Sequence, residues 1–164
     1  MKNLYIDFDG VICNTIEVSY EMIKASGVDL KDENKVRQFY KKLDWNSLLK
    51  KCEIINDSFE NIKKIQNSGK FNVSILTHVN SMDEIIAKVK YIRKYLEDIT
   101  IIPVPKTISK TKMINARFSI LVDDFNGNLD EWKEAGGIGV RFDLDMNKKG
   151  FLVIDHLDTL LELF

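Results

Sequence analysis

The sequence predicts an α/β protein with a Rossmann-like parallel sheet flanked by helices. One observation is that short apolar runs of strand length alternate along the chain with segments of helical periodicity. Another is that three of these runs end abruptly in acidic or hydroxyl side chains. Strands that alternate with helices form a mostly parallel sheet covered on both faces, and open sheets of this kind bind ligands at the carboxyl ends of their strands.

Length and composition set limits on what the chain does. The 164 residues suffice for one domain with a core, and a net charge of −1 gives no long-range attraction for a nucleic acid polymer or an anionic membrane. No apolar run approaches the roughly 20 residues of a membrane span, and the first residues lack the apolar core of a signal peptide. Two cysteines make no disulfide framework. We expect a cytoplasmic monomer or homodimer whose partner is a small molecule.

The opening stretch contains the first candidate site. The apolar run at 4–6 is followed by Asp7, Asp9 and Gly10. Buried carboxylates are costly unless they are paired or bind a metal, so two acids at the end of a central strand call for a cation. Gly10 permits a turn that few other residues tolerate. The alternative is a strand that runs into a solvated acidic turn.

A long helical segment follows this turn. Helices are expected from about Thr15 to Ser26, then around the apolar residues of 36–43 and 45–49, and from about 55 to Gly69, with no strand among them. This is too much for one crossover connection. We therefore predict a small helical cap at 15–55 over a catalytic core formed by 1–14 and 56–164. The alternative is that these helices only coat the sheet.

The rest of the chain alternates regularly. Ser81 and Glu84 predict a capping box for a helix whose apolar face is formed by Met82, Ile85, Ile86, Val89, Ile92 and Leu96. Asn128 with Glu131 predicts the start of a second helix. Strands are expected at 73–76, 99–104, 119–122 and 138–142, an edge strand at 151–154, and a last helix at 158–164.

Three core strands each end in a chemically reactive group. Asp7 and Asp9 follow the first, Thr77 follows the second, and Asp123 with Asp124 follow a later one. In a parallel sheet these carboxyl ends lie on one edge. The segment before the last of these strands carries three lysines, at positions 106, 110 and 112.

With these motifs the chain resembles the haloacid dehalogenase (HAD) superfamily of aspartate-nucleophile phosphatases and phosphotransferases. The resemblance covers roughly 1–14 and 70–145: Asp7-Phe8-Asp9-Gly10-Val11 is similar to the first motif, 74–77 to the second and 121–124 to the fourth. The helical insertion resembles the cap of many members. The Asp-Asp ending, the small size and the segment 128–137 look most like the 5′(3′)-deoxyribonucleotidase-like branch.

The resemblance implies a role for each acid. Asp7 would attack phosphorus and form an aspartyl-phosphate. Asp9 would protonate the leaving oxygen and then activate the water that releases phosphate. Mg²⁺ would be held by Asp7, the backbone carbonyl of Asp9, and Asp123. Asp124 would lie behind these ligands and orient the lysine or a metal-bound water.

The resemblance also implies groups that bind the phosphoryl oxygens. Thr77 would offer its hydroxyl. His78 follows Thr77 directly and is a candidate for contact with the phosphate loop or the substrate; the alternative is a loop histidine with no chemical role. An ammonium group would bridge the nucleophile and the phosphoryl group. Lys110 fits best, because a short helical turn could carry it inward, while Lys106 and Lys112 are the alternatives.

The function expected from these residues is Mg²⁺-dependent hydrolysis of a small phosphomonoester, with a 5′-(deoxy)nucleotide as the candidate substrate. A sugar-phosphate phosphatase or a phosphotransferase of the same superfamily is the alternative. A phosphorylation-switched receiver module is disfavoured, because receivers place their paired acids after the first strand and this chain places them late. A catalytically silent binding protein ranks lower still, because the expected groups are all present.

Overall fold

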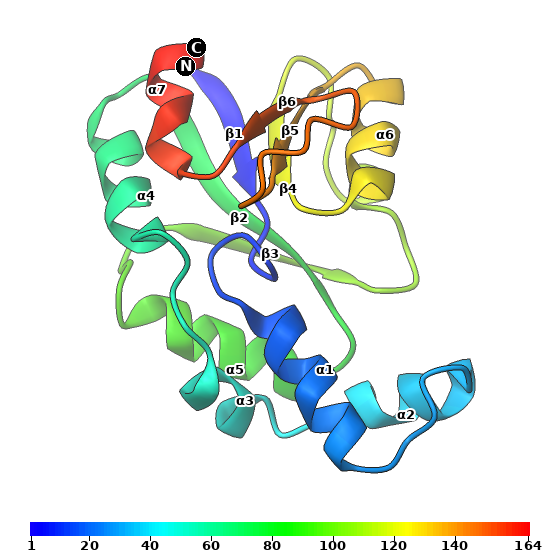
Figure 1. Ribbon diagram of the computed structural model, residues 1–164. Helices are drawn as coiled ribbons and strands as arrows, with labels where there is room; N and C mark the ends of the chain where they lie inside the picture. The colour runs from blue at the N-terminus through cyan, green and yellow to red at the C-terminus, as the bar shows by residue number, and fades with distance from the viewer.

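A computed structural model describes all residues, 1–164, and it confirms the predicted fold class. The six strands form one parallel sheet in the order β3-β2-β1-β4-β5-β6, flanked by helices (Figure 1). None of the helices is both long and apolar enough to cross a bilayer. The strands are β1 Lys2–Ile6, β2 Phe71–Val79, β3 Thr100–Pro105, β4 Ile120–Asp123, β5 Ile138–Phe142 and β6 Leu152–Ile154. The helices are α1 Thr15–Ala25, α2 Glu33–Lys42, α3 Trp45–Lys51, α4 Ser58–Asn67, α5 Met82–Arg93, α6 Asn126–Glu134 and α7 Leu160–Leu163, with 3₁₀ turns η1 Lys110–Lys112 and η2 Leu157–Thr159.

Successive side chains of the central strand β1 point to opposite faces of the sheet, and each face is covered by helices. Leu4 and Ile6 of β1 join the larger apolar core, which α4, α5 and the C-terminal residues cover. Tyr5, between them, faces the opposite way and meets Trp132 of α6 edge to face, with 5.4 Å between ring centroids. A strand buried on both sides reads as a continuous apolar run, which is why Leu4-Tyr5-Ile6 predicted it correctly.

The register of the sheet places Asp7 and Asp123, which are far apart in the sequence, next to each other at the same edge. Ile6 of β1 pairs with Val122 of β4, and the backbone N–H of Asp7 donates to the Val122 carbonyl at 2.9 Å. Asp7 and Asp123 therefore leave adjacent strands side by side. On the other side of β1, Ile6 pairs with Ile75 of β2. The strand β2 continues past its expected end at Thr77 to Val79, because it pairs with β3 over its full length.

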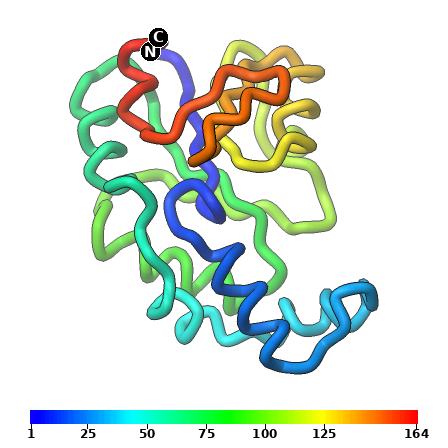
Figure 2. The backbone as a smooth tube through the Cα atoms, viewed as in Figure 1, coloured from blue at the N-terminus to red at the C-terminus, as the bar shows by residue number.

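The helices α1, α2 and α3 leave the sheet and return to it through one narrow connection. Ile55 donates its N–H to Ile12 at 2.9 Å, and Asn14 and Glu53 are joined by two hydrogen bonds, of 3.1 Å between backbones and 2.7 Å to the Asn14 side chain. In Figures 1 and 2 these helices stand at the end of the molecule opposite the two termini. The division into a cap at 15–55 and a core stays a prediction.

Two helix predictions were wrong in detail. The helix α6 begins at Asn126, two residues before the expected start, because the Asn128 side chain does not cap it but donates to Asp123 at 2.9 Å. In α5 half of the capping box was correct, since Ser81 accepts from the N–H of Glu84, but the Glu84 side chain accepts from the N–H of Asn80 rather than from that of Ser81. The apolar face was not: Met82 and Ile86 are exposed, and the helix buries Glu84, Ala87, Lys88 and Ile92 instead.

Candidate active site

The acidic strand ends meet around a buried lysine. The Nζ of Lys110 donates to Asp7 Oδ1 and to Asp123 Oδ2, both at 2.7 Å. All three side chains are almost completely buried. The 3₁₀ turn η1 carries Lys110 inward, as expected, whereas Lys106 and Lys112 are exposed. Of the three lysines, Lys110 is the one that contacts Asp7 and Asp123, and its role in binding phosphate stays a prediction.

Three of the acids are arranged as a group that could hold a cation. Asp7, Asp123 and Asp124 each bring a carboxylate oxygen within 4.8 Å of the others. Burial raises the pKa of Asp124 to about 8, aided by the negative charges of Asp7 and Asp123. Burial likewise raises the pKa of Asp7 to about 7, although Lys110 opposes the shift. This cluster of oxygen ligands with excess negative charge fits Mg²⁺.

Local backbone features hold Asp123 and Asp124 in place. The Oδ1 of Asp123 accepts from the N–H of Phe125 at 3.0 Å, and its Oδ2 accepts from Asn128. The buried Arg141 donates to the backbone carbonyl of Asp124 at 2.8 Å. These contacts fix the turn after β4, so that both acids face the cluster.

Gly10 allows Asp124 to approach the first turn closely. Its φ of +75° lies in the left-handed region, and a Cβ at this position would lie 2.3 Å from Asp124 Oδ2. The residue is needed both for its backbone conformation and for the space above it. The sequence predicted the first requirement, and only the structure reveals the second.

Asp9 lies apart from this cluster, between the helical insertion and the sheet. Its Oδ1 accepts from the Thr15 hydroxyl at 2.6 Å, and its Oδ2 accepts from Lys88 at 2.6 Å. Thr77 is 1% exposed, and its hydroxyl lies 3.4 Å from Asp9 Oδ2 and 3.1 Å from Lys88. Thr77 is thus behind Asp9, outside the cavity lining, and its role in binding phosphate stays a prediction.

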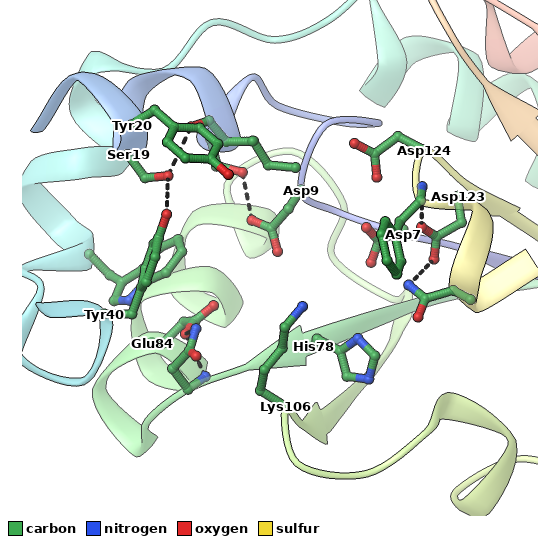
Figure 3. A pocket seen from close by; sticks show the side chains of 16 residues that line it. Asp7, Asp9, Ser19, Tyr20, Tyr40, His78, Glu84, Lys106, Asp123 and Asp124 are labelled. Atoms are coloured by element: carbon green, nitrogen blue, oxygen red, sulfur yellow. Dashed lines mark hydrogen bonds between the residues drawn. The ribbon is translucent and has the colours of Figure 1, made fainter. Parts of the chain in front are cut away.

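The acids face a cavity of about 430 Å³ between the sheet edge and the insertion. In Figure 3, Asp7, Asp123 and Asp124 lie on one side, Ser19 and Tyr40 lie on the other, and Asp9 lies between them. His78 lies at the cavity wall with Nε2 2.9 Å from the Ile108 carbonyl, and burial lowers its pKa. The lining residues from the insertion are Thr15, Ile16, Ser19, Tyr20, Tyr40 and Trp45.

Sequence reasoning missed two buried groups beside Asp9, namely Lys88 and Glu84, each 1% exposed. Charged residues on a helix are normally solvated, so their types gave no sign of burial. One available signal was their i, i+4 spacing on the face that also carries Ala87 and Ile92. The sequence offers a second and more apolar face of the same helix, which contains Met82 and Ile86, and that face was predicted to be the buried one.

Solved structures with a similar fold are known, although comparisons of the sequence found no match. No family model matches the chain, and no curated protein does. Similar solved structures include a HAD-superfamily hydrolase from Ehrlichia chaffeensis, with 12% identity over 99% of this chain and 97% of that one and a TM-score of 0.59. A beta-phosphoglucomutase from Clostridium difficile has 15% identity over 98% and 93%, with a TM-score of 0.60. The D,D-heptose 1,7-bisphosphate phosphatase from B. bronchiseptica, complexed with magnesium and phosphate, has 13% identity over 99% and 97%, with a TM-score of 0.58.

These likenesses identify the architecture. The chain has the fold of the HAD-superfamily hydrolases, a group of structures that includes phosphatases. At identities of 11–15%, the likeness concerns the fold and not the activity.

Proposed function

We propose that this protein is a Mg²⁺-dependent phosphatase that hydrolyses a small phosphomonoester through an aspartyl-phosphate on Asp7. The observation that carries the proposal is the buried Lys110 between Asp7 and Asp123, two acids that line the cavity together with Asp124. Lys110 neutralises part of the charge around Asp7, so an anionic phosphoryl group can approach an anionic nucleophile. The pattern of the first and fourth motifs supports membership of the HAD superfamily.

The metal would be held by Asp7, Asp123 and the backbone carbonyl of Asp9, with Asp124 adjacent. A bound Mg²⁺ would stabilise the negative charge that gathers on the phosphoryl oxygens. Five acids, Asp7, Asp9, Glu84, Asp123 and Asp124, line the cavity, whereas Lys110 and Lys88 are the two buried ammonium groups beside them. The excess of carboxylates is the physical reason to expect a cation.

Asp9 is the acid and base in the proposed reaction. It follows the nucleophile by two residues and lies on the insertion side of the cavity, where the leaving group would lie. There it would protonate the departing oxygen and afterwards take a proton from the attacking water. The insertion would reduce access of bulk water to these steps.

The test of this proposal is a screen of phosphate release with MgCl₂. Nucleoside 5′-monophosphates, sugar phosphates and 4-nitrophenyl phosphate would be compared, each with and without EDTA. We expect EDTA-sensitive release and a preference for the nucleotides, as in the deoxyribonucleotidase-like branch. Better turnover of sugar phosphates would favour the alternative substrate class, while transfer to an added alcohol would favour a phosphotransferase. No release from any substrate would contradict the proposal.

Lys106 is expected to strengthen substrate binding. It is the one lysine that lines the cavity, it forms no ion pair, and in Figure 3 its amine extends into the space between Asp9 and Asp7. Replacing it with alanine removes a charge-assisted hydrogen bond, so KM should rise about tenfold or more. Lys112→Ala is the matched control, because Lys112 is exposed and outside the lining. An equal KM for both variants would remove Lys106 from the substrate site.

Metal binding should become stronger as pH rises. With folded-state pKa values of about 7 for Asp7 and about 8 for Asp124, against ordinary values near 3.8, the metal-free folded protein binds more protons than the unfolded chain between pH 4 and 8. Its stability therefore falls with rising pH over that range. Mg²⁺ binds the ionised carboxylates, so bound Mg²⁺ offsets the loss of stability that their ionisation causes.

We accordingly expect MgCl₂ to raise the Tm more at pH 8.5 than at pH 6. Asp124→Asn, which cannot ionise, should weaken this pH dependence. The measurement is thermal unfolding at both pH values with and without the metal. A Tm increase that is the same at pH 6 and 8.5 in the wild-type protein would contradict the assignment.

A further inference from the structure

Lys88 of α5 is buried beside Asp9 without contacting the cavity. It is 1% exposed, and its Nζ donates to Asp9 Oδ2 at 2.6 Å, to the Thr77 hydroxyl at 3.1 Å and to the His78 carbonyl at 3.1 Å. Lysines are almost never fully buried unless they are paired. Three ordered acceptors around one ammonium group define its position, and through it the position of the Asp9 carboxylate.

Glu84 supplies a second negative charge for Lys88. Its Oε1 lies 2.7 Å from Lys88 Nζ, one helical turn away, and its Oε2 accepts from the backbone N–H of Asn80 at 2.7 Å. Although burial alone would lower it, the pKa of Lys88 is raised, because Asp9 and Glu84 together outweigh the loss of solvation. Lys88 thus links two carboxylates, Asp9 at 2.6 Å and Glu84 at 2.7 Å, and its bond to Asp9 directs the Asp9 carboxyl group.

The helical insertion covers the other side of this group. The ring of Trp45, from α3, lies 4.8 Å from Lys88 Nζ, and the Phe8 ring lies 5.4 Å from it. Thr15, from α1, binds the remaining oxygen of Asp9. One oxygen of Asp9 is therefore held from the sheet side through Lys88 and the other from the insertion, which fixes the rotation of the carboxyl group.

We infer that Lys88 is a positioning residue for Asp9, which it holds at the boundary between sheet and insertion so that the carboxyl group faces the leaving oxygen. The inference rests on the proposed phosphatase function. It assigns Lys88 no contact with substrate or metal, in agreement with its absence from the cavity lining. A misplaced acid is a poor proton donor, and displacements of about 1 Å can cost about 10²-fold in rate.

The test compares kcat/KM for two substrates that differ in leaving group. Phenyl phosphate needs a proton donor for its departing oxygen, whereas 4-nitrophenyl phosphate releases a stable anion. Lys88→Met should lower kcat/KM for phenyl phosphate at least about tenfold more than for 4-nitrophenyl phosphate, which is the pattern expected of Asp9→Asn. Lys90→Met, an exposed lysine of the same helix, is the control and should leave both values unchanged.

A double-mutant cycle separates positioning from a general structural role. If Lys88 acts through Asp9, the Asp9→Asn/Lys88→Met variant should be no slower than Asp9→Asn alone. Losses that multiply, or a Lys88→Met loss equal for both substrates, would overturn the inference while leaving the phosphatase function intact. An inactive wild-type protein would overturn both. If Lys88→Met fails to fold, Glu84→Gln/Lys88→Met removes the unpaired buried charge and provides the same comparison.

Discussion

Replacing Asp7 with asparagine is expected to abolish turnover while the protein remains folded. The amide cannot attack phosphorus, so no aspartyl-phosphate forms, and loss of a nucleophile typically costs about 10⁴-fold or more. The side chain retains an oxygen that can accept from Lys110, which limits structural change. Because burial raises the pKa of Asp7 to about 7, a neutral side chain here should leave the Tm at pH 8 unchanged or higher. Phosphate release and thermal unfolding measure the two effects.

Asp98→Asn provides the control for this experiment. Asp98 is exposed and lies after α5, so its substitution should change neither activity nor Tm. Residual turnover above about 1% in Asp7→Asn would remove Asp7 from the nucleophile role. A large fall in Tm would instead indicate that Asp7 is needed for the structure.

Gly10→Ala is expected to cost both activity and stability, and Gly27→Ala separates the two causes. Both glycines have φ of +75°, so each substitution introduces left-handed strain of about 1–2 kcal/mol. Only at Gly10 would the new Cβ collide with Asp124, whereas nothing lies within 4 Å at Gly27. We expect kcat/KM to fall about 10²-fold in Gly10→Ala and to be unchanged in Gly27→Ala.

The comparison of these two variants isolates the displacement of Asp124. Urea unfolding would measure the free energy of unfolding and phosphate release would measure activity. Equal activities for the two variants would show that the closeness of Asp124 to the first turn has no part in turnover. A greater loss of stability at position 27 would contradict the contact seen at Gly10.

The sheet could be predicted because its strands carry their own signal. Ile120-Leu121-Val122 is buried on both faces, and in Leu4-Tyr5-Ile6 the two aliphatic residues are buried on one face while Tyr5 is half-buried on the other, so each appears as an unbroken apolar run. Parallel order then placed Asp7 and Asp123 on one edge without knowledge of their register. The inward turn of Lys110 agrees with the short helical turn expected there, although the sequence alone left Lys106 and Lys112 as alternatives.

What failed depended on contacts that local sequence does not encode. The predicted face of α5 was wrong because Met82 and Ile86 are more apolar than Glu84 and Lys88. Burial of Lys88 is favourable because its ammonium group pairs with Asp9 as well as with Glu84, and Asp9 lies on another segment of the chain. Asn128 was assigned to a helix cap because its type suits one, while in the structure Asp123 takes its amide. Both errors concern polar residues, Lys88 and Asn128, that contact a carboxylate on another element of the structure.

The narrow connection at Asn14 and Glu53 has a consequence for how such proteins could diversify. Since the two ends of the intervening segment are already hydrogen-bonded to each other, a graft of different length could replace it without a change in the spacing of the sheet strands. New molecules could then be recognised through a swapped module while the reaction centre is retained. Such a graft would still need a hydroxyl like that of Thr15 on Asp9 and a ring like that of Trp45 over Lys88, so two contacts of the replaced segment would have to be kept.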